Sequence, residues 1–232
     1  MSVALIRAIA KSVIVLILFV VCLWWGRQVR ESFDRSELWQ PRLILDAGHG
    51  GEDGGAVSPG GRRESTINLD IVRKMDQLLA FLGQPALLLR EADISLHDEQ
   101  AVTLREKKVS DLKNRVKTVG QYPSAILVSI HQNSYPDPKY RGTQVFYAPT
   151  TASQALAEQL QSAVISHLQP ENSRQEKEIP KSIYLMNHIQ NTAVLVECGF
   201  LTNPEDEILL QQADYQRKLA IVLSSALADA LE

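Results

Sequence analysis

Cysteine is scarce in this sequence of 232 residues, which contains only Cys22 and Cys198. The two lie near opposite ends of the chain, and no Cys-x-x-Cys pair occurs. A disulfide framework and a zinc finger held by thiolates are therefore excluded.

An excess of positive charge is also missing, because 24 lysines and arginines stand against 27 aspartates and glutamates and give a formal net charge of −3. No basic field is available to hold a nucleic-acid backbone, so we expect no nucleic-acid partner. Internal repeats and low-complexity tracts are absent as well. With 45% hydrophobic and 22% charged residues, the composition is that of a globular domain with a sizeable core.

The long hydrophobic run in the sequence is Val13–Trp25 (VIVLILFVVCLWW), with Arg7 and Lys11 before it. Thirteen residues span about 20 Å as a helix, less than the roughly 30 Å of a bilayer core. If the Lys11 side chain snorkels to the interface, the helical stretch becomes almost long enough to cross the bilayer core. We therefore expect residues 1–26 to form an uncleaved signal anchor, a transmembrane helix with its N-terminus inside.

Two other interpretations of this run stay open, a cleaved signal peptide and a buried core helix. The small-residue pattern of a cleavage site is missing, since Trp24-Trp25-Gly26-Arg27 follows. Both export interpretations predict that the remainder lies on the extracytoplasmic side of the cell membrane. Residues 27–40 then form a polar linker, and residues 41–232 form the catalytic domain.

From Pro41 on, short apolar runs of strand length alternate with segments of helical periodicity. The runs mostly lack polar alternation and are rich in Val, Ile and Leu, as expected of strands covered on both faces. We expect strands at Arg42–Leu45, Ala86–Leu89, Ala125–Ile130, Thr143–Tyr147, Ile183–Leu185 and Ala193–Val196.

The helical segments have apolar faces and recognisable ends. Thr103 and Glu106 form the pattern of a capping box, and Asn203-Pro204 is a helix start followed by acids. Strands separated by helices predict an α/β fold, a single domain with a mainly parallel twisted sheet of about six strands flanked by helices. Helices are expected near Ile71–Leu82, Leu104–Val119 and Ser153–Leu168, from Pro204 on, and near Leu219–Ala230.

Polar clusters follow three of the predicted strands. His49 lies in Asp46-Ala47-Gly48-His49-Gly50, His131 follows Ser129-Ile130, and Glu197 follows Val196. Ligands gather at the carboxyl ends of strands in open α/β sheets. A single histidine there is commonly a structural hydrogen-bond donor, but two histidines with an acid on a third strand favour a metal site.

Two neutral imidazoles need an oxygen ligand to complete a catalytic zinc site with a position left for water. The acids near His49 are Asp46, Glu52, Asp53 and Glu64, and spacing leaves the choice among them open. Glu64 has a small advantage because it directly precedes a helix that we expect to begin near Ser65, from where it can reach back over the same rim.

Glu197 differs from these acids because four apolar residues, Ala193–Val196, precede it. Its carboxylate should emerge at the edge of a low-dielectric core, where a carboxyl pKa rises toward neutrality. A carboxyl group of that kind suits a general base that later acts as an acid. The alternative is a helix-capping or salt-bridged glutamate.

Four ordered segments resemble the zinc-dependent N-acetylmuramoyl-L-alanine amidases of the amidase-3 type. They are LDAGHGGEDGGA (Leu45–Ala56), GRRESTINL (Gly61–Leu69), SIHQNS (Ser129–Ser134) and VECGFLTNPED (Val196–Asp206). The resemblance implies one Zn²⁺ per chain bound by His49, Glu64 and His131, with Glu197 as the catalytic carboxylate. It also implies peptidoglycan as the substrate, cut at the amide between N-acetylmuramic acid and L-alanine. Asn133 is a candidate substrate contact.

Within this family, Ser134–Tyr147 (SYPDPKYRGTQVFY) resembles the CwlD-like spore-germination branch. That branch implies a role in forming muramic-δ-lactam in the spore cortex and a location in the forespore intermembrane space. An activating protein partner stays unidentified. Alternative functions are a vegetative cell-wall amidase, a zinc peptidase acting on stem peptides, and a catalytically silent wall-binding protein.

Other polar residues are assigned less specific places. The basic residues between Arg105 and Lys117 are expected on the solvent face of their helix. Arg62 and Arg63 either meet a stem-peptide carboxylate or lie in solvent. Cys198 is expected to be a packed thiol rather than a nucleophile.

Overall fold

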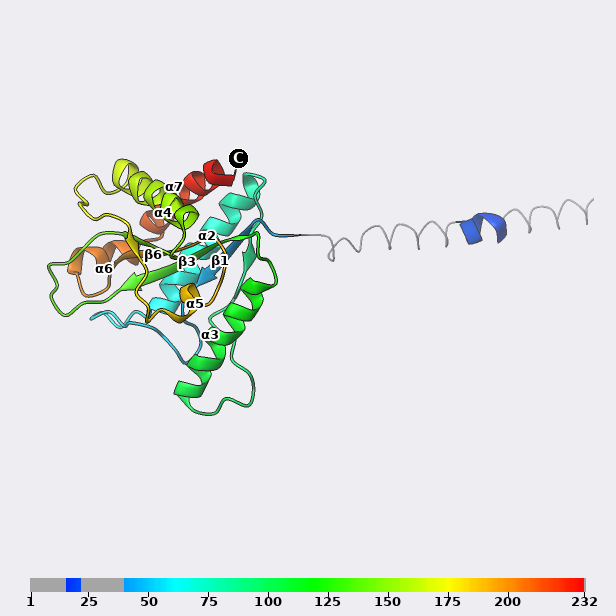
Figure 1. Cartoon of the computed structure of the whole chain (residues 1–232), viewed down its shortest axis with the longest axis horizontal. Coiled ribbons are helices and arrows are strands. Elements are labelled where there is room, and N and C mark those ends of the chain that lie inside the picture. The colour runs from blue at the N-terminus through cyan, green and yellow to red at the C-terminus, as the bar shows by residue number, and fades with distance from the viewer. Residues whose placement is uncertain (1–15, 22–39, 232) are drawn as a thin grey trace, which may run out of the picture. The chain divides into compact units, whose positions relative to one another are not determined.

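The computed structural model describes residues 16–21 and 40–231 (Figure 1). Apart from a helical turn at residues 16–21 and Gln40, the predicted anchor (residues 1–26) and linker (27–40) lie outside the described residues. Among the residues described, no helix has both the length and the apolar character needed to cross a membrane. The residues from Pro41 onward form one compact unit.

This unit is built on one sheet of six strands in the order β2-β1-β3-β6-β4-β5. The first four strands in that order run parallel, and β4 pairs antiparallel with β6 while β5 runs parallel to β4. The expected α/β domain with a mainly parallel six-stranded sheet is confirmed. The strands are β1 (Leu43–Ala47), β2 (Leu87–Leu88), β3 (Ile126–Asn133), β4 (Gln144–Tyr147), β5 (Lys177–Glu178) and β6 (Ala193–Phe200).

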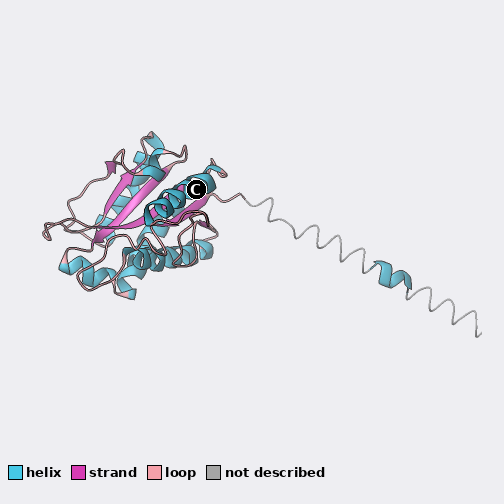
Figure 2. Ribbon diagram, turned by 90° about the horizontal axis from the view of Figure 1, so that it is seen from below, coloured by secondary structure: helices cyan, strands magenta, loops and turns pink. Residues whose placement is uncertain are grey.

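Helices cover both faces of the sheet (Figure 2). On one face α7 packs against both α2 and α4, α2 contacts β1 and β3, α4 contacts β4 and β6, and α6 lies beside α7. On the other face lie α3 and the short α5, which contact each other (Figure 1). The helices are α2 (Glu64–Phe81), α3 (Leu104–Gly120), α4 (Thr151–His167), α5 (Tyr184–Asn187), α6 (Pro204–Leu210) and α7 (Ala213–Leu231).

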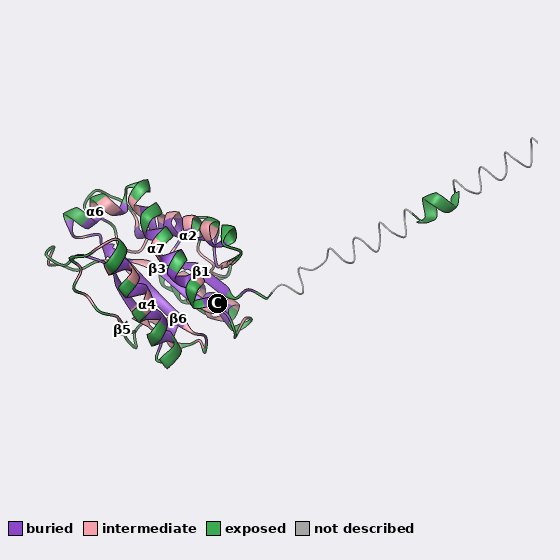
Figure 3. Ribbon diagram, turned by 90° about the horizontal axis from the view of Figure 1, so that it is seen from above, coloured by how far each residue is buried: buried purple, intermediate pink, exposed green. Residues whose placement is uncertain are grey.

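The central strands are buried on both faces, which explains their unbroken apolar sequences (Figure 3). In β1, Leu43 and Leu45 join the core under α2 and α7, while Ile44 points into the second core, which also contains Val119 of α3. Successive strand residues point to opposite faces, so one short strand contributes to both cores.

The predicted helix starts are confirmed. The Thr103 side chain accepts a hydrogen bond from the backbone N–H of Glu106, and the Glu106 carboxylate accepts the backbone N–H of Thr103. The side chain of Asn203 accepts from the N–H groups of Glu205 and Asp206 at the start of α6.

One strand prediction is wrong. Ile183–Leu185 does not form a strand, because α5 begins at Tyr184 and turns Leu185 and Met186 into the second core. The sixth strand is β5, two exposed charged residues paired with Phe146 and Tyr147 at the sheet edge. An edge strand needs no apolar pattern, so its sequence carries no signal.

The predicted ends of two central strands are also too early. β3 continues through His131 to Asn133, and β6 continues through Glu197 to Phe200. His131 and Glu197 therefore lie within paired strands, which fixes their backbones more firmly than a loop would.

Candidate active site

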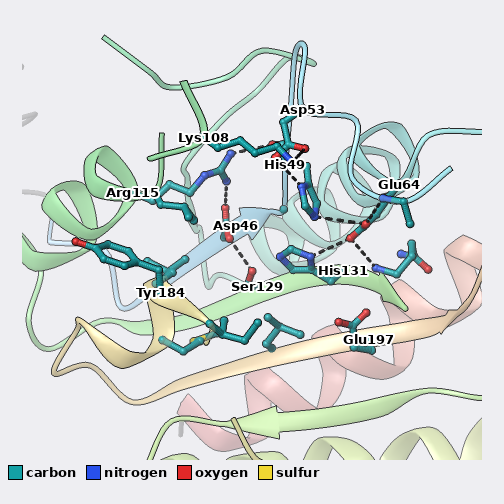
Figure 4. Close-up of a pocket in the computed structure, with 18 of the residues that line it drawn as sticks. Asp46, His49, Asp53, Glu64, Lys108, Arg115, Ser129, His131, Tyr184 and Glu197 are labelled. Carbon is teal, nitrogen blue, oxygen red and sulfur yellow. Dashed lines mark hydrogen bonds and ion pairs between the residues drawn. The ribbon is translucent and has the colours of Figure 1, made fainter. Parts of the chain in front are cut away.

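Four side chains from separate parts of the chain converge beside the carboxyl end of the sheet (Figure 4). His49 follows β1, and Glu64 is the first residue of α2. His131 and Glu197 are direct partners in the register of β3 and β6. The parallel register thus brings an imidazole and a carboxylate from distant segments next to each other.

His49, Glu64 and His131 form a group able to hold a metal ion. One donor atom from each residue lies within 4.8 Å of the others. Glu64 Oε1 is 2.9 Å from His131 Nδ1, and Glu64 Oε2 is 3.4 Å from His49 Nε2. Two imidazoles and one carboxylate are a donor set of catalytic zinc sites, which leave a further position open.

The electrostatics of this group suit a cation. Burial alone would lower the pKa of His49, but hydrogen bonds with Asp53 and Glu64 raise it to about 10. Burial alone would raise the pKa of Glu64, yet hydrogen bonds from His131 and His49 hold it well below its usual range. The surroundings therefore stabilise positive charge next to an ionised Glu64, and these residues fit a divalent ion.

Glu197 faces the same pocket from β6 and has no such support. Its Oε2 atom is buried and has no hydrogen-bond partner among the described residues. Burial is the main cause of a rise in the pKa of Glu197 to about 7, which the negative charge of Glu64 supports and the two histidines oppose. A carboxyl group with this pKa can both accept and return a proton near neutral pH.

A tight loop holds His49 over the site. His49 has a φ of +64°, the sole positive value among non-glycine residues of the described chain. Its Nδ1 atom lies 2.9 Å from Asp53 Oδ2, which fixes the ring so that Nε2 points toward Glu64. A Cβ atom at Gly48 would clash with the ring of His131. Glycine at this position therefore allows the loop to pass close to the site.

The four acids that spacing left open occupy different places. Asp46 is buried, forms an ion pair with Arg115 and accepts a hydrogen bond from Ser129. Glu52 is exposed and pairs with Lys107. Asp53 forms a hydrogen bond with His49 Nδ1, the ring nitrogen that does not face Glu64. Glu64 alone of the four lies within the group formed with both histidines.

Arg115 corrects the expectation that the basic residues of α3 all face solvent. Its side chain is 1% exposed and donates to Asp111 as well as pairing with Asp46. It also donates to the carbonyl oxygens of Ala47 and His49, at 3.1 and 2.8 Å. Arg115 therefore secures the loop that carries His49, and its four-residue spacing from Asp111 was the only signal in the sequence.

Arg90, another residue that the sequence did not single out, supports the same loop. Its guanidinium donates to the carbonyl oxygens of Ala47, Gly48 and Ser65. It follows β2 in a short apolar segment without a recognisable motif, so no pattern could have identified it.

The site opens into a pocket of about 410 Å³. Asn133 lines it, and the Asn133 Oδ1 atom accepts the backbone N–H of Ser134. The pocket also has an apolar part of its lining from Ile183–Met186 at α5. A substrate can therefore lie across the four converging side chains and meet both polar and apolar lining residues.

The remaining sequence candidates do not join the site. Cys198 is a buried free thiol whose pKa is raised by burial, in agreement with a packed side chain. Arg63 donates to the carbonyl oxygen of Gly51 and lies 3.8 Å from Asp93, and Arg62 is exposed. Neither arginine lines the pocket.

Several known proteins are similar to this chain over most of its length. The germination-specific N-acetylmuramoyl-L-alanine amidase of Bacillus subtilis (strain 168) is 32% identical over 198 residues, covering 82% of this chain and 82% of the relative. The solved CwlD amidase from Clostridioides difficile, in complex with the GerS lipoprotein, superposes with a TM-score of 0.78 at 35% identity. That match covers 82% of this chain and 97% of the CwlD chain.

A second solved structure, an N-acetylmuramoyl-L-alanine amidase from Clostridium difficile 630, has a TM-score of 0.71 at 26% identity and covers 83% of this chain and 98% of its own. The family profile described as N-acetylmuramoyl-L-alanine amidase matches residues 43–229, nearly the whole unit that begins at Pro41. The converging His49, Glu64, His131 and Glu197 thus lie in a chain that belongs to the N-acetylmuramoyl-L-alanine amidase family.

Proposed function

We propose that this amidase holds one Zn²⁺ per chain through His49, Glu64 and His131 and uses Glu197 to move protons. The observation that carries this proposal is the buried Oε2 atom of Glu197, which has no hydrogen-bond partner in the described part of the chain and lies on the side of the group of three potential ligands (Figure 4). Native proteins rarely leave such an atom unsatisfied without a functional reason.

The chemistry supplied by a zinc ion at this place is polarisation of the substrate carbonyl and activation of water. Glu197 takes the proton from the attacking water and delivers it to the departing nitrogen of L-alanine. Because its pKa is about 7, Glu197 can accept the proton and release it again near neutral pH. Asp53 keeps His49 in one orientation, and Asn133 contacts the substrate at the pocket wall.

The substrate that we propose is spore-cortex peptidoglycan. The support is the similarity to a Bacillus subtilis amidase described as germination-specific. Removal of the peptide from muramic acid would precede formation of muramic-δ-lactam. We further propose that residues 1–26 anchor the chain in the cell membrane, with the catalytic domain on the extracytoplasmic side, in the forespore intermembrane space.

We also propose an activating protein partner, because the similar CwlD amidase was solved with the GerS lipoprotein. Co-purification with the full chain would identify this partner. Carbonate extraction of membranes tests the anchor, since an integral segment keeps the chain in the pellet.

Digestion of purified sacculi tests the activity. The full chain in detergent, with zinc, is incubated separately with vegetative and spore-cortex sacculi. Mass spectrometry then identifies the products. We expect intact stem peptides and peptide-free glycan, with cortex cleaved faster. Fragments cut within the stem peptide would instead indicate a peptidase. Activity that persists after chelation would contradict the metal assignment.

A further inference from the structure

A second surface pocket, of about 280 Å³, lies beside the proposed catalytic site. It is lined by Asn133, Tyr135, Tyr140, Arg174 and Phe200. Asn133 also lines the larger pocket that contains Glu197, so the two pockets meet at this residue. A substrate that extends beyond Glu197 past Asn133 therefore enters the second pocket.

The strand register gives the spacing between the two pockets. His131 pairs with Glu197, and Asn133 pairs with Phe200, so β6 contains one residue more than β3 over this step and forms a bulge. Phe200 lies three positions beyond Glu197, which corresponds to about 10 Å along a strand. An extended peptide covers that distance with about three residues.

Aromatic rings form the walls of the second pocket. The rings of Tyr135 and Tyr140 meet edge to face with centroids 5.0 Å apart, and Tyr140 lies 6.4 Å from Phe200. Tyr135 is 51% exposed and Tyr140 39%, whereas Phe200 is buried. The pocket therefore has low-dielectric walls open to an incoming ligand, and such walls strengthen a charged hydrogen bond.

Arg174 is the cation of this pocket. Its guanidinium carbon lies 4.6 Å from the centroid of Phe200. Its Nε atom donates to the carbonyl oxygen of Arg141 at 2.8 Å, and one terminal nitrogen donates to the side-chain oxygen of Gln144 at 3.0 Å. These three contacts hold the guanidinium in place without neutralising its charge.

The neighbouring cations are paired, and Arg174 is not. Arg141 forms ion pairs with Glu171 and Glu205, and Lys139 pairs with Asp137. Within the described part of the chain, no carboxylate lies within 4.0 Å of the Arg174 nitrogens. Asp206 is the acid that acts on Arg174 from further away, and its Oδ2 atom already accepts the N–H groups of Gly142 and Phe200.

We infer that Arg174 binds a carboxylate of the stem peptide on the leaving side of the cleaved amide. The inference rests on the proposed function, which places the amide at Glu197. A guanidinium recognises a carboxylate through paired, charge-assisted hydrogen bonds. The second pocket is thus the subsite that selects a peptide with free carboxylates, about three residues from the cleaved bond.

The test measures binding of two zinc-loaded proteins to two probes. The parent is the full chain in detergent with Glu197→Gln, and the second protein adds Arg174→Gln. The probes are disaccharide-tripeptides with the peptide carboxylates all free or all converted to amides. We expect the parent to prefer the free acid, and Arg174→Gln to weaken binding of that probe by about tenfold, the effect of losing a charged hydrogen bond.

Two further variants serve as controls. Arg174→Lys keeps the charge without the planar fork and should retain part of the preference for the free acid. Arg141→Gln removes an exposed, paired arginine nearby and should bind both probes like the parent.

Equal binding of the two probes by the parent, or no binding of the free-acid probe, would overturn the carboxylate subsite. So would an unchanged preference in Arg174→Gln. A loss of affinity for both probes in equal proportion would indicate a purely structural role and would overturn it too. Failure of the wild-type chain to cleave the probe would instead count against the proposed function, because the binding ratio decides the subsite independently of cleavage.

Discussion

Two clusters of charged side chains border the same pocket, and they differ in how their charges are satisfied (Figure 4). In the cluster of Asp46, Arg115 and Asp111, both carboxylates pair with the guanidinium, and Ser129 donates to Asp46. In the cluster around Glu64, the carboxylate lies between two histidines and a nearby acid, Glu197, is left with a buried unpartnered oxygen.

The difference shows that burial alone does not identify a catalytic carboxylate. Asp46 is more completely buried than Glu197, yet Arg115 and Ser129 hold its pKa below the usual value against the effect of burial. Among the described residues the buried Oε2 atom of Glu197 has no hydrogen-bond partner, and the pKa of Glu197 rises instead. A network in which every charge is paired stabilises the fold, whereas a carboxylate with an unpaired oxygen can still bind a ligand or a proton.

The largest effect is expected at Glu197. Replacing it with glutamine removes the proton acceptor but keeps the shape, so hydrolysis of sacculi should fall by at least about 10³-fold, within the range of general acid-base catalysis. Zinc content and the melting temperature should stay near those of the wild type. Loss of zinc in this variant would show that Glu197 is a metal ligand like Glu64, and the two carboxylates would then not have separate roles.

Glu64→Ala should act on the metal. Removing a direct ligand should weaken zinc binding by more than the roughly 10–100-fold that loss of a supporting hydrogen bond costs. Equilibrium dialysis followed by zinc quantification measures this, with Glu52→Ala as the control because Glu52 is exposed and paired with Lys107. Wild-type zinc affinity in Glu64→Ala would direct attention to Asp53 as the oxygen ligand.

Arg115→Met tests the paired cluster. It leaves Asp46 buried without its cation, which should reduce the free energy of unfolding by about 3–5 kcal/mol. Urea denaturation of the variant measures the loss. Adding Asp46→Asn should recover part of it, since Asp111 is then the one carboxylate of this cluster left without its cation. If Arg115→Met were as stable as the wild type, the cluster would not have the structural role that its complete pairing implies.

Much of the fold is predictable because the responsible physics is local. The unbroken apolar runs predict β1, β3 and β6, and the capping box of Thr103 predicts the start of α3. β5 is not predictable, since two charged residues join the sheet edge only through backbone pairing with β4. α5 is mistaken for a strand because a run of three to four apolar residues fits either element.

The site is predictable to the same limited extent. His49 follows β1, and His131 and Glu197 lie toward the carboxyl ends of β3 and β6, so the parallel topology alone predicts that they lie close together. The choice of Glu64 over Asp46 depends on the path of the loop between β1 and α2, which spacing does not determine. Arg115 and Arg174 were missed because their partners are backbone carbonyls, distant carboxylates and rings that only the tertiary structure brings near.

The smallest effect is expected at Asp53, which belongs to neither cluster but contacts His49 of the cluster around Glu64. Its Oδ2 atom lies 2.9 Å from His49 Nδ1, while its Oδ1 atom lies 2.8 Å from Lys108. Asp53→Asn should weaken zinc binding about 10–100-fold by loosening the ring that it orients, as chelator competition can measure. Lys108→Ala is the matched control, because a partly exposed ion pair contributes at most about 1 kcal/mol. If both variants weakened zinc binding equally, the charge around Asp53 rather than its hold on His49 would determine affinity, and the loop could not be regarded as a positioning device.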